Sequence, residues 1–134
     1  MSRAKRFPVR GPYSLTLSLA SSYRFAGAFR DGSHVFKTAV RVEDEPVLME
    51  VSQVEDDPPV LEVAAPRADP PASLEDAAAW MLFGGLNLAP FYELVKGHSV
   101  LGQAVRRLHG LKPTRPPTLF EMAVTAVTEQ QISM

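Results

Sequence analysis

The stretch VFKTAVRVEDEPVLMEVSQVEDDPPVLEV, residues 35 to 63, determines what kind of sheet this chain forms. It contains three runs rich in β-branched residues, at 35–42, 47–54 and 60–63. The runs are separated by the sequences EDEP and EDDPP, in which acidic residues and prolines are typical of turns. Short strands joined by short turns predict an antiparallel sheet.

Two further strands are expected before this stretch. In residues 13–19, a tyrosine and three leucines alternate with serine and threonine, which is typical of a strand with one solvent-exposed face. Residues 23–29 form a weaker candidate strand. Asp31-Gly32 follows and favours a hairpin, because both residues tolerate positive φ. The sequence therefore predicts an antiparallel sheet domain over residues 1–65.

The period of the hydrophobic pattern changes after a proline-rich linker at residues 66–72. Apolar residues then recur at helical spacing, so residues 73–134 should form the first helices of an incomplete all-α domain. Ser73 can cap the first of these helices, with Asp76 in the reciprocal position, and the helix should end near residue 84. The predicted fold class is therefore α+β.

Two short helices are expected in the middle of this helical part. The first covers residues 90–96 and has Pro90 in its first turn, where a missing N–H costs nothing. Ser99 can cap the second helix, which covers residues 100–109 and is closed by Gly110.

The last predicted helix has a polar residue where its apolar face should continue. Thr118 and Glu121 form a capping box at its start. At roughly 100° per residue, Gln131 has the azimuth of this apolar face. Either the helix ends at Gln131, or the amide contacts a hydrogen-bonding partner. Since no glycine or proline stop follows, we expect an interrupted helical domain. The apolar face consists of Phe120, Ala123, Val124 and Val127.

Composition narrows the class of protein. The chain has 134 residues, of which 46% are apolar, and this is enough for one domain with a real core. It has no cysteine, which excludes disulfides and thiolate metal sites. The longest uncharged stretch, residues 77–92, is shorter than the roughly 20 residues that a membrane-spanning helix needs. We therefore expect a soluble protein, cytoplasmic or nucleoid-associated, without membrane contact.

The formal net charge of −1 hides an uneven distribution. Eleven of the fifteen acidic residues lie within residues 43–76, whereas the first ten residues carry four bases and no acid. Five bases follow residue 94. Because basic surfaces attract phosphate, four of these bases are candidate DNA contacts: Arg106, Arg107, Lys112 and Arg115. The same residues are also consistent with an ordinary solvated helix face. The five bases are Lys96, Arg106, Arg107, Lys112 and Arg115.

Metal and phosphate-loop chemistry have little support in the sequence. The three histidines, His34, His98 and His109, do not have the spacing of metal ligands. Gly84-Gly85 lacks the Lys-Ser/Thr pair of a phosphate loop and is typical of a helix end. We expect no metal and no organic cofactor.

Three motifs of the helical part occur in a fixed order: LNLAPFYELV (86–95), SVLGQAVRRLHGLKP (99–113) and TLFEMAVTAVTEQQIS (118–133). Together they resemble the start of the helix–hairpin–helix DNA glycosylase family, particularly its 3-methyladenine glycosylase branch. The first half, with YSLTLSLASSYRF before a hairpin, looks like the antiparallel N-terminal domain of alkylation-repair and oxoguanine glycosylases. The departures are His98, where an aspartate is common, and the acidic turns.

The resemblance implies base excision repair, in which a damaged and in particular an alkylated base is flipped out of double-stranded DNA and its N-glycosidic bond is hydrolysed. In the family, the position matching Gln131 enters the minor groove and fills the space of the flipped base. A glutamine amide suits this role because it both donates and accepts hydrogen bonds. Gln130 and Ser133 are weaker candidates for the same contact. The alternative for Gln131 is a helix cap or core-edge residue.

The resemblance covers nearly all of this chain but only about half of the family's protein. The family's glycine-rich hairpin and catalytic aspartate are expected downstream of Met134, since no aspartate follows Asp76. We therefore expect a truncated glycosylase, inactive alone, or one half of a split protein. Such a chain should self-associate or pair with a complementary C-terminal chain. The alternative function is a non-enzymatic module that binds another protein or DNA.

Overall fold

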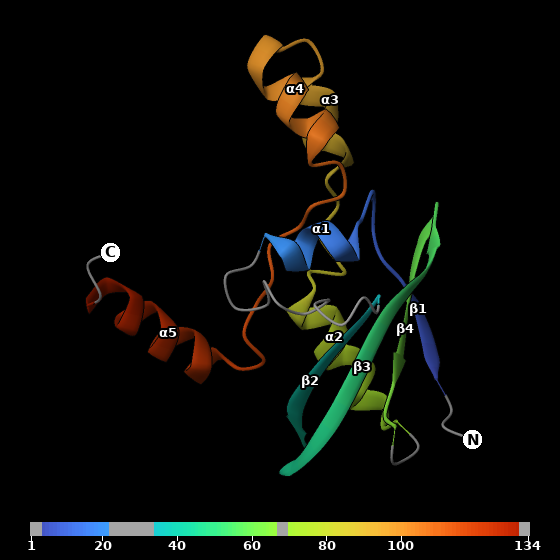
Figure 1. Cartoon of the computed structure of the whole chain (residues 1–134), viewed down its shortest axis with the longest axis vertical. Helices are drawn as coiled ribbons and strands as arrows, with labels where there is room; N and C mark the ends of the chain where they lie inside the picture. The colour runs from blue at the N-terminus through green and yellow to red at the C-terminus, as the bar shows by residue number, and fades with distance from the viewer. Residues whose placement is uncertain (1–3, 22–33, 67–69, 132–134) are drawn as a thin grey trace.

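The computed structural model describes residues 4–21, 34–66 and 70–131. These residues form an α+β fold with a four-stranded antiparallel sheet and five helices (Figure 1). In chain order the elements are β1 (Lys5–Pro8), α1 (Leu15–Ala20), β2 (Val35–Val42), β3 (Glu45–Asp56), β4 (Pro59–Ala64), α2 (Ala72–Met81), α3 (Ala89–Val95), α4 (Ser99–Arg107) and α5 (Leu119–Gln131).

The strand order in the sheet is β1-β4-β3-β2, and all neighbours are antiparallel. The predictions of strands over 35–42, 47–54 and 60–63 are confirmed, although β3 is longer than expected. Glu43 and Asp44 form the β2–β3 turn with φ of 51° and 67°. Backbone twist of this hand suits a tight hairpin. The predicted strand at 23–29 and the Asp31-Gly32 hairpin lie outside the described residues.

The prediction of a strand over residues 13–19 is wrong, because this segment contains helix α1. Its N-cap is Ser14, whose hydroxyl accepts a hydrogen bond from the Leu17 N–H at 3.3 Å. Gln53 of β3 fixes the entry to the helix, since its side-chain oxygen accepts from the Leu15 N–H at 2.8 Å. Leu15, Ser18 and Leu19 are buried at positions i, i+3 and i+4, so packing selects the helical period.

Strand β1 was not anticipated from the sequence. It has four residues and lies at the edge of the sheet, where Phe7 is opposite Leu61 of β4 and is buried. Arg6 pairs with Glu62 on the outer face at 2.9 Å. Pro8, which lacks an N–H, is tolerated in an edge strand. The strand is too short, and too polar around Phe7, for an alternating pattern to be recognised.

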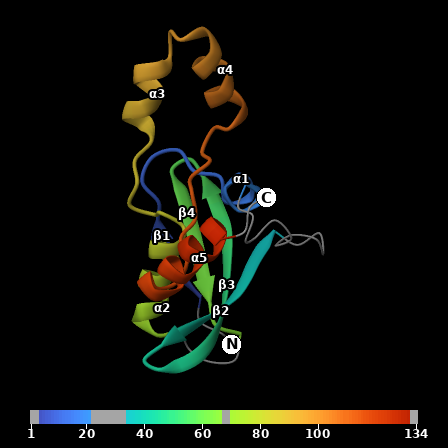
Figure 2. The same cartoon turned by 90° about the vertical axis from the view of Figure 1, so that its left-hand side faces the viewer.

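Helix α2 covers one face of the sheet (Figure 2). It contributes Leu74, Ala78 and Met81 to the same core cluster as the inner residues of the strands. The helix itself was predicted, but the predicted cap is wrong. Pro71 occupies the N-cap position, and the buried Ser73 hydroxyl has no hydrogen-bond partner among the described residues. The sheet and α2, which the proline-rich linker joins, therefore share one core.

Helices α3 and α4 form a pair that projects beyond one end of the sheet, and α5 projects to the side (Figures 1 and 2). The predicted short helix with Pro90 near its start is confirmed as α3. The predicted capping box of α5 is also confirmed, since Thr118 Oγ1 accepts from the Glu121 N–H at 3.1 Å and Glu121 Oε2 accepts from the Thr118 N–H at 3.2 Å. Among the described helices, none has both the length and the apolar character needed to cross a membrane.

Candidate functional site

Lys112 is buried and cannot contact DNA, so its prediction as a phosphate ligand is wrong. Its exposed fraction is 0%. Its ammonium group donates to the carbonyl oxygens of Arg10 at 2.7 Å, Phe83 at 3.4 Å and Leu86. Three carbonyl oxygens thus accept the hydrogen bonds that a phosphate or water oxygen would otherwise accept. Lys112 connects the loop before α1 with the loop between α2 and α3.

The surroundings of Lys112 shift two pKa values. Burial lowers the pKa of the Lys112 ammonium to about 8, because an apolar environment disfavours the charged form. Burial also raises the pKa of Tyr13, whose ring centre lies 5.2 Å from Lys112 Nζ. The buried Tyr13 hydroxyl has no hydrogen-bond partner among the described residues. The Lys112 ammonium group and the Tyr13 hydroxyl group therefore lie in the interior of the protein.

Arg115 fixes the chain that leads into α5. Its guanidinium carbon lies 4.1 Å from the ring centre of Trp80 and 3.5 Å from that of Phe83. Its backbone N–H donates to the Met81 carbonyl at 2.8 Å, and the Trp80 indole N–H donates to the Pro116 carbonyl at 3.1 Å. These contacts hold the segment before α5 against the end of α2.

Arg106 and Arg107 lie in the last turn of α4 and are exposed, as a DNA contact requires. Within the described part of the chain, neither forms an ion pair with a carboxylate. Gln130 is exposed on α5, and Gln131 is the last residue of that helix. The side chain of Gln131 and the whole of Ser133 lie outside the described residues. Figures 1 and 2 show that α4 and α5 lie apart, so the structure does not bring the arginines and glutamines together.

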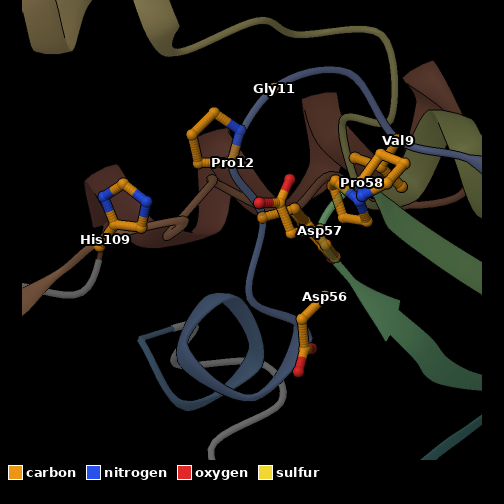
Figure 3. Close-up of a pocket in the computed structure, with 9 residues that line it drawn as sticks. Val9, Gly11, Pro12, Asp56, Asp57, Pro58 and His109 are labelled. Atoms are coloured by element: carbon orange, nitrogen blue, oxygen red, sulfur yellow. The ribbon is translucent and has the colours of Figure 1, made fainter.

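A cleft of about 550 Å³ lies between the loop before α1, the β3–β4 turn and the end of α4. In Figure 3 the Asp57 side chain lies beside Pro12, His109 lies to the left of Pro12, and Asp56 lies lower in the view. Asp56 Oδ1 accepts from Gln53 Nε2 at 3.1 Å. Two carboxylates disfavour a DNA phosphate here. Across the described residues, no group of three or more His, Cys, Asp or Glu side chains could hold a metal ion.

A smaller hollow of about 300 Å³ lies on the α3–α4 pair and has a basic rim. Lys96, Arg106 and His109 contribute to its lining. Sequence reasoning identified Arg106 but not its neighbours. The available signal was the spacing of Gly102, Arg106 and His109 at i, i+4 and i+7, which places them on one face of α4 and its extension.

Apolar side chains are exposed on two helical surfaces. A groove of about 230 Å³ on the α3–α4 pair is lined almost entirely by apolar residues, including Phe91, Leu101 and Leu108. On α5, Phe120 is 76% exposed and Val127 is 60% exposed. Large exposed apolar patches are characteristic of surfaces that bind other proteins.

No family model matches this chain, and neither a curated protein nor a solved structure with significant similarity was found.

Proposed function

We propose that this chain is the N-terminal part of a base-excision-repair DNA glycosylase and supplies DNA-binding surface to it, in the cytoplasm or nucleoid. The main support for this proposal is that α5 is a fully formed helix that ends at Gln131. The motif TLFEMAVTAVTEQQIS begins with a formed capping box and continues as one helix to Gln131. A groove-entering glutamine requires such a stiff support, because the amide must reach the position of a flipped base.

The charge on the helical part also supports DNA binding. Arg106 and Arg107 are exposed without carboxylate partners among the described residues, so their guanidinium groups can contact phosphate. No aspartate follows Asp76 in the sequence. We therefore assign duplex binding to residues 1–134, and we assign them no step in the cleavage of the N-glycosidic bond.

A second candidate function is a non-enzymatic module that binds another protein. The exposed apolar residues of the α3–α4 groove and of α5 favour it, because such surfaces associate with protein rather than with nucleic acid. The two functions differ in what they predict for Gln131, which only the DNA-binding function requires.

The test is the affinity of the chain for a duplex containing an abasic-site analogue, compared with an undamaged duplex. We expect Gln131→Ala to weaken binding to the abasic duplex about tenfold, since one such hydrogen-bonded contact contributes about 1–2 kcal/mol. Binding to undamaged duplex, and the salt dependence of both, should change little because no phosphate contact is lost.

Gln103→Ala is the matched control, because Gln103 is an exposed glutamine on α4. It should leave both affinities unchanged. If Gln131→Ala lowers the melting temperature but leaves binding to the abasic duplex unchanged, Gln131 is a helix-end residue and the proposed site is wrong.

A further inference from the structure

The hollow on the α3–α4 pair has a floor formed by Gly102 and a rim formed by longer side chains. Gly102 is buried, and a Cβ atom built on it would lie 3.8 Å from Arg106 Nη1. The absent side chain therefore leaves room beside the guanidinium group. The backbone carbonyl oxygens of Val95 and Lys96, at the C-terminal end of α3, each lie 3.6 Å from the same Cβ position, so the end of α3 closes the other side of this floor.

His109 forms the other end of the rim and is held there by Tyr92. The two rings stack with centres 5.0 Å apart and an angle of 29° between their planes. The Tyr92 hydroxyl in turn accepts a hydrogen bond from the Gly110 N–H at 2.8 Å. The imidazole is thus held between α3 and the turn after α4, where it lines both this hollow and the cleft that contains Asp56 and Asp57.

The charge of the hollow is positive. Glu93 is the one carboxylate that lines it, and its Oε2 atom lies 3.7 Å from Lys96 Nζ. Both side chains are about three-quarters exposed, at 74% and 75%, so this pair is weak and easily exchanged. Arg106 forms no ion pair among the residues that the structure describes. Its guanidinium can therefore bind two oxygens of one phosphate.

We propose that Lys96, Arg106 and His109 form a binding site for one phosphate of the backbone of duplex DNA. This rests on the proposed function, and it identifies which helical surface contacts the duplex. Lys96 provides a point charge, Arg106 a two-pronged donor and His109 a single hydrogen bond. The site reads no sequence, because it contacts phosphate and not base edges.

The test uses the 134-residue chain and an undamaged duplex at three or more salt concentrations. Arg106→Gln and Lys96→Gln should each weaken binding roughly fivefold to tenfold near 0.1 M salt and reduce the slope of log K against log salt by about one. Arg106→Lys should retain the slope because the charge is kept. Arg41→Gln is the control, since it removes one exposed charge from β2, away from the hollow.

If Arg106→Gln and Arg41→Gln weaken binding equally, the effect is one of net charge and this site does not exist. If Arg106→Gln lowers only the melting temperature, Arg106 stabilises the end of α4 and the site is again wrong. Either result leaves the proposed function standing, because that function is tested by the preference for the abasic duplex. A chain that binds no duplex at all would overturn both.

Discussion

Lys112 joins three segments that are far apart in the sequence through its ammonium group and its backbone N–H. It donates to carbonyl oxygens of the loop before α1 and of the loop between α2 and α3, while its backbone N–H donates to Ser18 Oγ at 3.0 Å. A buried charge is costly unless it is fully hydrogen-bonded. Here the acceptors are fixed backbone groups, so the lysine and the three segments stabilise one another.

Replacing Lys112 with Met should lower the free energy of unfolding by about 2–3 kcal/mol at pH 7, because buried carbonyls lose their donor. Urea denaturation followed by circular dichroism measures this change. Lys37→Met is the control, since Lys37 is exposed and pairs with Glu50 on the sheet surface. It should cost about 1 kcal/mol or less. An equal effect of both substitutions would contradict the role assigned to Lys112.

The same substitution should change the pH dependence of stability. The folded chain loses the Lys112 proton near pH 8, whereas the unfolded chain keeps it to about pH 10.5. Between these values the unfolded state binds more protons, so this lysine makes stability rise with pH, and Lys112→Met should remove the rise. Above pH 10, the raised pKa of Tyr13 acts in the opposite direction, because the folded state then retains a proton that the unfolded state has lost.

At the scale of single elements, α4 has a cap that the sequence did not indicate. The prediction placed Ser99 at the N-cap, but Ser99 is the first helical residue and His98 is the cap. His98 Nδ1 accepts from the Leu101 N–H at 3.1 Å. Aspartate is among the best N-cap residues, so it is the natural replacement to test at position 98.

We expect His98→Ala to lower the free energy of unfolding by about 1 kcal/mol and His98→Asp to equal or exceed the wild type, since a carboxylate accepts the same hydrogen bond and also interacts with the helix dipole. Thermal unfolding monitored at 222 nm provides the measurement. Ser99→Ala should have little effect. A larger loss from Ser99→Ala than from His98→Ala would show that the cap is wrongly assigned.

At the scale of the whole molecule, the apolar residues are divided between a closed core and open helical surfaces. The core contains the inner residues of the strands together with those of α1 and α2. In contrast, none of the described α5 side chains belongs to this core, and Phe120 and Val124 are exposed. It is anchored at its start by the contacts of Arg115 with α2.

We expect the chain to self-associate through α5 as concentration rises, because association removes exposed apolar surface from water. Phe120→Ser combined with Val124→Ser should reduce the association measured by light scattering. Ala126→Ser, an exposed residue roughly 120° or more around the helix from Phe120, is the control. A strictly monomeric wild type at high concentration would contradict this expectation.

Local signals in the sequence determined the β2–β3–β4 sheet, the helical second half and the capping box of Thr118 and Glu121, because alternation, turn chemistry and capping depend on neighbours along the chain. Only the tertiary structure decided that residues 15–20 form a helix, since Leu15 and Leu19, four residues apart, share a face in both a strand and a helix until Gln53 and the core select one. It also decided the candidate site. Arg106 and Lys112 are both basic residues near α4, yet one is exposed and the other is buried against carbonyls that come from residues 10, 83 and 86. No local pattern contains those carbonyls, so burial of this cation could be read only from the fold.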